Sequence, residues 1–145
     1  MKIYVDADAC PVIHIVEEIA EQFNVKCILV SDHNHVLHSH YSEIITVGSG
    51  FDAADSKIMN MIEPKDVLVT GDYGLASLAL SKDVSIMNHF GDMYTTFNID
   101  TLLAQRHLNQ KIRQSSGRVK GPKKRVHEDD QRFHRKFKAL IQSVL

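Results

Sequence analysis

The sequence lacks the features that mark a secreted or membrane-spanning protein. Its two cysteines, Cys10 and Cys27, are too few for the disulfide framework of a small secreted protein. They are also too far apart in the sequence for the close pairs that zinc sites use. No apolar run approaches the roughly 20 residues that a membrane-spanning helix needs. The opening MKIYVDADACP is strand-like, whereas a signal peptide would be charged and then apolar. We therefore expect a cytoplasmic protein with reduced thiols and no membrane association.

A net charge of −1 hides a strong division of charge along the chain. Residues 1–105 hold 5 Lys and Arg against 15 Asp and Glu, whereas residues 106–145 hold 12 against 3. An acidic body beside a basic segment suits a metal site next to a surface that attracts a polyanion. The alternative is a solvated helical face. With 145 residues and no internal repeat, we expect one domain over residues 1–145, in which residues 106–145 form a basic helical C-terminal extension.

Short apolar runs alternate with amphipathic segments through the first two thirds of the chain. Helices are predicted to begin near Pro11, Asp52 and Asp72, and strands are predicted at residues 2–5, 26–30, 44–47, 67–70 and 84–87. This alternation predicts an α/β fold with a parallel, doubly wound sheet. Such a sheet binds its ligands outside the carboxyl ends of its strands.

The C-terminal part of the chain is predicted to be helical. One helix is expected from about residue 98 to 113, followed by the loop SSGRVKGPKKR and a last helix from about residue 129. The last helix has an apolar stripe that should pack on the body, made of Phe133, Phe137, Leu140, Ile141 and Val144.

Aspartates follow the predicted strands. They are Asp6 and Asp8 after the first strand, Asp52 and Asp55 after the third, Asp72 after the fourth and Asp92 after the fifth. Each one alone could cap a helix, but capping uses one acid per helix and two of these sites carry a pair. Because the carboxyl ends of parallel strands share one edge, the side chains are expected to cluster and to repel one another unless they bind protons or a cation.

Oxygen ligands without clustered thiolates favour Mg²⁺ or Mn²⁺, as one or two ions. Two such ions can activate water and stabilise the leaving oxygen of a phosphodiester. We expect Asp6, Asp72 and one of Asp52 or Asp55 to bind metal directly. Asp8 and Asp92 would complete a second site or hold metal-bound water.

The chain resembles the YaiI/YqxD family of bacterial proteins, which belong with the PIN-like nuclease folds. The resemblance runs nearly end to end and rests on VDADACP, GFDAAD, TGDYGLA, YTTFNI, GPKKR and EDDQRF. It implies a PIN-like α/β fold, and it suggests that Asp6, Asp8, Asp52, Asp55 and Asp72 match the acidic catalytic positions of metal-dependent ribonucleases. This chain has Gly71 and Tyr73-Gly74 where other members carry Ala and Ile-Pro around the same aspartate.

Basic residues are the candidates for binding nucleic acid, expected to be single-stranded RNA, through its phosphates. Lys57 could instead offset charge in the transition state, or simply be a solvated helix lysine. The candidates are Lys57, Arg106, Arg113, Arg118, Lys120, Lys123, Lys124 and Arg125.

Other functions stay open at this point. Asp6 and Asp8 could be the nucleophile and acid of a haloacid-dehalogenase-like phosphatase, although the usual second Asp after Gly71-Asp72 is missing. The chain could also be a non-catalytic RNA-binding module. Cys10 near His14 could be a thiol nucleophile, but a structural cysteine is favoured. The histidines 33, 35, 38 and 40 are interpreted as a polar loop, with a transition-metal site as the alternative.

Overall fold

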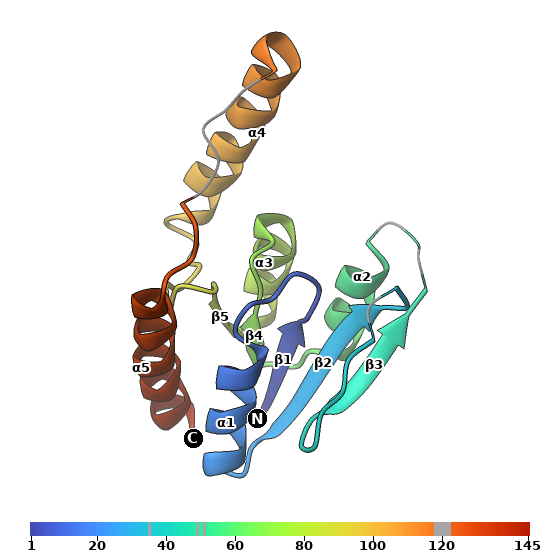
Figure 1. The fold of residues 1–145 in the computed structure, drawn as a ribbon, viewed down its shortest axis with the longest axis vertical. Coiled ribbons are helices and arrows are strands. Elements are labelled where there is room, and N and C mark those ends of the chain that lie inside the picture. The colour runs from blue at the N-terminus through green and yellow to red at the C-terminus, as the bar shows by residue number, and fades with distance from the viewer. Residues whose placement is uncertain (35, 49, 51, 118–122) are drawn as a thin grey trace.

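A computed structural model describes residues 1–34, 36–48, 50, 52–117 and 123–145. Five strands form one parallel sheet in the order β3-β2-β1-β4-β5. They are β1 (Lys2–Asp6), β2 (Lys26–Asp32), β3 (Glu43–Val47), β4 (Val67–Val69) and β5 (Ser85–Met87). The predicted class, a doubly wound parallel α/β sheet with a C-terminal helical extension, is confirmed (Figure 1).

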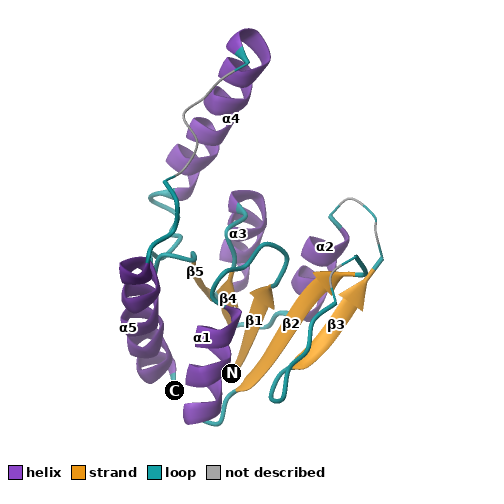
Figure 2. Cartoon of the chain, in the orientation of Figure 1, coloured by secondary structure: helices purple, strands orange, loops and turns teal. Residues whose placement is uncertain are grey.

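Helices cover both faces of the sheet (Figure 2). They are α1 (Ile13–Gln22), α2 (Ala53–Met61), α3 (Tyr73–Ala79), the 3₁₀ turn η1 (Leu80–Lys82), α4 (Ile99–Ser116) and α5 (His127–Val144). Side chains alternate along β1 because successive residues of a strand point to opposite faces. Ile3 and Val5 pack under α1 and α5, whereas Tyr4 packs under α2 and α3.

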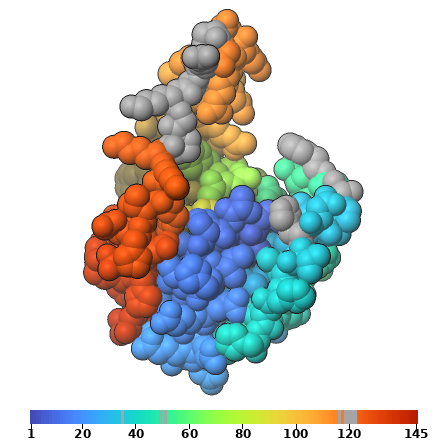
Figure 3. Space-filling view, in the orientation of Figure 1, coloured from blue at the N-terminus to red at the C-terminus, as the bar shows by residue number. Residues whose placement is uncertain are grey.

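The apolar stripe of the last helix packs as predicted. Phe133, Phe137 and Ile141 are fully buried in the same core as α1, and the two phenylalanine rings stack 5.3 Å apart. Figure 3 shows α5 lying against the α1 segment on one side of the body. The C-terminal extension therefore shares its core with the sheet.

Some predicted boundaries differ by a few residues from the structure. The first helix begins at Ile13 and not at Pro11, because the chain first turns at Ala7–Cys10, where the Cys10 N–H donates to the Ala7 carbonyl. The last helix begins two residues earlier than expected, at His127. Its first turn holds three acids, Glu128, Asp129 and Asp130, which suit the positive end of the helix dipole. Among the described residues, none of the helices combines the length and apolar character that crossing a bilayer requires.

Candidate functional site

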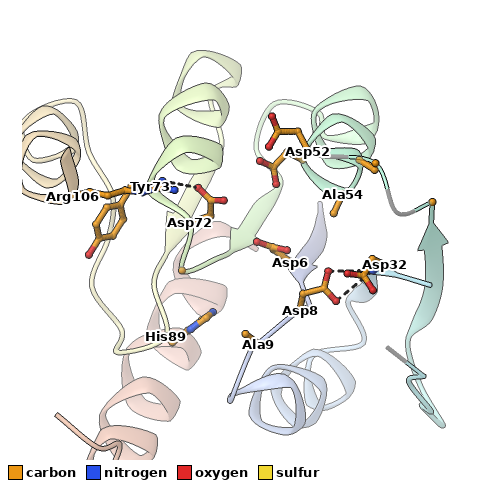
Figure 4. Close-up of a pocket in the computed structure, with 15 residues that line it drawn as sticks. Asp6, Asp8, Ala9, Asp32, Asp52, Ala54, Asp72, Tyr73, His89 and Arg106 are labelled. Atoms are coloured by element: carbon orange, nitrogen blue, oxygen red, sulfur yellow. Dashed lines mark hydrogen bonds and ion pairs between the residues drawn. The ribbon is translucent and has the colours of Figure 1, made fainter. Parts of the chain in front are cut away.

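Five of the six predicted aspartates line one cavity of about 790 Å³ at the carboxyl edge of the sheet. We call it the aspartate cavity. In Figure 4 the labelled carboxylates of Asp6, Asp8, Asp52 and Asp72 surround one hollow. Asp6 ends β1 and Asp8 follows it, whereas Asp52 precedes α2 and Asp72 precedes α3. The fifth, Asp55, also lines it. The parallel strands thus bring together acids that are far apart in the sequence.

Asp6 lies at the centre of this arrangement, as the last residue of β1. Buried Thr70 donates a hydrogen bond from Oγ1 to Asp6 Oδ2 at 2.9 Å, and the same Oγ1 accepts one from the Asp72 N–H at 3.0 Å. Burial raises the pKa of Asp6 to about 6, with further contributions from Asp55, Asp72 and Asp8, while the Thr70 hydrogen bond opposes the rise. One threonine therefore ties together two carboxyl-bearing segments that repel each other.

Asp52 and Asp55 bring more negative charge from the start of α2. Burial raises the pKa of Asp55 to about 6; the carboxylates of Asp72 and Asp52 add to the rise, and Arg106 counteracts it. Asp52 stands at the N-cap position with φ 60°, yet its side chain makes no capping hydrogen bond within the described part of the chain. Helix capping, the ordinary reason for an aspartate here, does not explain Asp52.

Asp72 does cap its helix. Its Oδ1 accepts hydrogen bonds from the Gly74 N–H at 2.8 Å and the Leu75 N–H at 3.2 Å. Arg106 Nη1 lies 3.7 Å from the same oxygen. The capping alternative therefore holds for Asp72, and the cap fixes its carboxylate at the wall of the cavity.

Asp32 is a cavity residue that the sequence reasoning missed. It is the last residue of β2 and lines the aspartate cavity. Its N–H donates to both carboxylate oxygens of Asp8, at 3.2 and 3.4 Å. The signal was available, because Asp32 comes two residues after the strand predicted at 26–30, at the same edge as the other acids.

His89 and Tyr73 also line the cavity and were not predicted. The His89 ring lies so close to Gly71 that a Cβ at position 71 would come within 2.9 Å of His89 Cε1. A side chain at position 71 would therefore force the imidazole to shift. Burial, and next the charge of Arg125, lower the pKa of His89, which favours the neutral ring.

Asp92 lies elsewhere. It is not among the residues that line the aspartate cavity, and its Oδ1 accepts a hydrogen bond from Arg132 Nη2 at 2.8 Å. Arg132 also donates to the carbonyl of Phe90. The structure therefore gives Asp92 a role in attaching α5 to the segment after β5.

The predicted basic residues lie in different parts of the structure. Arg106 lines the aspartate cavity and Arg113 is exposed on α4, whereas Lys57, Lys123 and Lys124 are exposed and line no cavity that the structure describes. Arg118 and Lys120 lie outside the described residues.

Arg125 differs from the other candidates because its side chain is only 19% exposed. Its Nε donates to Asp130 Oδ1 at 2.8 Å, and its guanidinium lies 5.0 Å from the centre of the Phe90 ring. These contacts hold it against the body.

The donor set fits a hard divalent cation, but it is not a closed cage. Within the described residues, no three His, Cys, Asp or Glu side chains are placed as the ligands of one ion. Mg²⁺ usually keeps several waters and takes one or two carboxylates plus substrate phosphates. Burial is the largest cause of the raised pKa values of Asp6 and Asp55, and the neighbouring carboxylates add to it. A bound cation would stabilise the charged form of both groups.

The two other candidate sites have weaker support. Burial raises the pKa of the Cys10 thiol to about 11, so little thiolate exists at neutral pH and a structural role fits better. His38 and His40 line a separate hollow with glutamates of α1, and His40 Nε2 lies 3.0 Å from Glu21 Oε2. His33 is exposed, and His35 lies outside the described residues.

Comparison with known proteins places the chain in a family. Among solved structures, it is similar to Rae1 (YacP) from Bacillus subtilis, a W164L mutant, with a TM-score of 0.46 and 13% identity over 82% of this chain and 86% of that one. The UPF0178 protein of Clostridium acetobutylicum is 46% identical, and that of Clostridium tetani 45%; each match covers 97% of both chains. Residues 4–143 match the family described as "Uncharacterized BCR, YaiI/YqxD family". The chain belongs to the YaiI/YqxD family.

Proposed function

We propose that this protein is a divalent-metal-dependent phosphodiesterase that cleaves nucleic acid, with single-stranded RNA as substrate and Mg²⁺ or Mn²⁺ as cofactor. The observation that carries the proposal is the meeting of Asp6, Asp55 and Asp72 in one cavity, where the pKa values of Asp6 and Asp55 rise to about 6. Functional sites are where shifted carboxyl pKa values concentrate.

The residues have separate roles in this proposal. Asp6 and Asp72 hold the metal at the ends of β1 and β4, and Asp55 or Asp52 adds a third carboxylate. Bound metal supplies an activated water and stabilises the leaving oxygen. Thr70 keeps Asp6 and the backbone of Asp72 in register through its two hydrogen bonds. Arg106, beside Asp72, offers positive charge to a phosphate oxygen.

The test compares Asp72→Asn with Asp83→Asn. Asparagine at position 72 keeps the capping oxygen but removes the charge, so the fold should survive. Asp83 is exposed just before β5, at the opposite edge of the sheet. We expect Mn²⁺ to raise the melting temperature of the wild type and of Asp83→Asn but not of Asp72→Asn. Cleavage of labelled single-stranded RNA should fall about 100-fold or more in Asp72→Asn, because even outer-sphere partners of a metal contribute 10–100-fold.

Asp92→Asn sharpens the same test. Because Asp92 pairs with Arg132 away from the cavity, its substitution should leave the Mn²⁺-induced melting shift and the cleavage rate within about twofold of wild type. A wild-type protein that neither melts higher with Mn²⁺ nor cleaves RNA would refute the proposal. Hydrolysis of p-nitrophenyl phosphate without RNA cleavage would favour the phosphatase alternative.

A further inference from the structure

A second hollow, of about 380 Å³, lies between α3 and α4. We call it the α3–α4 groove. One wall is Tyr73, the first residue of α3. The other is a single face of α4 that begins at the apolar Leu102 and continues with Gln105, Arg106, Asn109, Gln110 and Arg113. These α4 residues recur at helical spacing, so the helix turns one polar, basic stripe toward the groove.

The groove adjoins the aspartate cavity. Tyr73 and Arg106 line both hollows, and Arg106 Nη1 lies 3.7 Å from Asp72 Oδ1 at their junction. Figure 4 shows the two side chains together at the side of the cavity nearest Asp72. A chain bound at the aspartates therefore has a direct path along α4.

The charge along α4 suits a polyanion. No Asp or Glu occurs from Ala104 to Ser116, whereas Arg106, Lys111 and Arg113 do. Arg106 and Arg113 are about two turns apart, roughly 10 Å along the helix axis. Arg106 makes an ion pair with Asp72, but none is found for Arg113 within the described residues.

The remaining groups of the groove suit nucleotide bases. The Tyr73 ring is half-buried and meets Tyr94 edge to face at 5.9 Å, so it is held in place as a surface on which a base can stack. The amides of Gln105, Asn109 and Gln110 offer both donors and acceptors to base edges. Gln105 Nε2 already donates to Asn109 Oδ1 at 3.1 Å, which orients this pair.

The structure also shows that this face of α4 contributes little to holding the fold. From Ala104 to Ser115 the side chains are exposed except for Asn109, which is half-buried. Figure 1 shows that the helix extends away from the sheet. This polar stripe leads from the acidic cavity and, because it does not serve packing, it is open to a ligand.

We propose that the α3–α4 groove binds the nucleotides on one side of the scissile phosphodiester in a single-stranded polynucleotide. Arg113 holds a phosphate, Tyr73 stacks a base, and the amides give a preference among bases. Cleavage of the bound strand rests on the proposed function, but binding in the groove needs neither metal nor cleavage.

The experiment measures binding of a labelled single-stranded oligonucleotide to the full chain by fluorescence anisotropy in EDTA. Arg113→Ala is compared with Lys111→Ala, which removes an exposed cation of the same helix that does not line the groove. We expect Arg113→Ala to weaken binding about 5- to 10-fold and to lower the salt slope by about one, and Lys111→Ala to change affinity less than twofold. Equal effects of the two substitutions would overturn the assignment.

Stacking and base preference have their own controls. Tyr73→Phe keeps the ring and should bind like wild type, whereas Tyr73→Leu should lose about tenfold. Gln110→Ala should change the ratio of affinities for poly-U and poly-A, and Gln114→Ala, off the groove, should not. A Tyr73→Leu variant that binds normally, or a duplex that binds as tightly as the single strand, would contradict the stacking surface.

The two proposals fail separately. Binding in EDTA that depends on Arg113 and Tyr73, without any cleavage in Mn²⁺, would support the groove and refute the nuclease. Cleavage that depends on Asp72, with binding insensitive to Arg113 and Tyr73, would support the nuclease and refute the groove. The absence of any binding in EDTA would overturn the groove.

Discussion

The two C-terminal helices have the same length but opposite relations to the core. Each has 18 residues. α5 buries Phe133, Phe137 and Ile141 completely, whereas the buried residue of α4 among those described is Ile99, at its first position. α5 is therefore held by apolar packing, and α4 is attached to the body mainly at its beginning.

The difference shows that basic charge alone does not identify a binding surface. The segment 106–145 carries 12 Lys and Arg against 3 Asp and Glu, yet two of its arginines serve packing. Arg132 attaches α5 to Asp92, and Arg125 pairs with Asp130 of α5 itself and lies over the Phe90 ring. The cations of α4 are not used in this way, and Arg106 reaches the aspartate cavity. In the C-terminal extension, α5 therefore serves the fold, whereas α4 is available for a ligand.

The largest predicted effect tests whether α5 is structural. Phe137→Ala removes a fully buried ring that stacks on Phe133, so we expect the free energy of unfolding to fall by about 3–5 kcal/mol. Leu108→Ala, at a side chain of α4 that is 51% exposed, should cost less than about 0.5 kcal/mol. Urea denaturation monitored by circular dichroism measures both. Similar losses for the two variants would contradict the comparison.

A pair of glycines gives the next largest effect. Gly91 has φ +89°, and a Cβ there would come within 2.8 Å of the Lys136 Cβ on α5. Gly117, after α4, has φ +76° with nothing within 4 Å. Gly91→Ala should therefore cost about 2–3 kcal/mol from backbone strain and the clash with α5, and Gly117→Ala about 1 kcal/mol from strain alone. The difference in midpoint urea concentration between the two variants is the measurement, and equal midpoints would show that α5 does not pack against Gly91.

The sheet was predictable because its determinants are local. Buried strands such as Val67–Val69 are short apolar runs, and the helices between them each have an apolar face. Because parallel strands share a carboxyl edge, the aspartates after them are predicted to lie at that edge. The boundaries near Pro11 and His127 depend on single turns and caps, so they were off by two residues.

The site was only partly predictable, because contacts between residues far apart in the sequence decide which side chains line the cavity. Asp92 follows a strand like the other acids, but a long-range pair with Arg132, 40 residues away, draws it out of the cavity. Arg125 looked like a phosphate ligand, but Asp130 and the Phe90 ring hold it. His89 follows the fifth strand and so lies at the same edge as the acids, but the room for its ring depends on the missing side chain of Gly71.

The smallest predicted effect is a change in the pKa of Asp55, which depends on an arginine of α4 and not on one of α5. The pKa of Asp55 is raised from 3.8 to about 6 in the folded protein, so the folded state binds more protons than the unfolded state between these values. The free energy of unfolding therefore falls as pH rises from about 4 to 6. Arg106 of α4 limits the loss by favouring the carboxylate, whereas Arg132 of α5 pairs with Asp92 instead.

Arg106→Ala should consequently raise the pKa of Asp55 further, and Arg132→Ala should leave it unchanged. The shift should be small, because the Arg106 side chain is 49% exposed and water screens its charge. Carboxyl NMR titration in EDTA measures the pKa directly, and urea denaturation at pH 4 and pH 7 should show a larger loss of stability with pH in Arg106→Ala than in wild type. If Arg132→Ala moved the Asp55 pKa as much as Arg106→Ala, the two helices would act alike on the cavity. Their different packing would then have no electrostatic consequence at the aspartates.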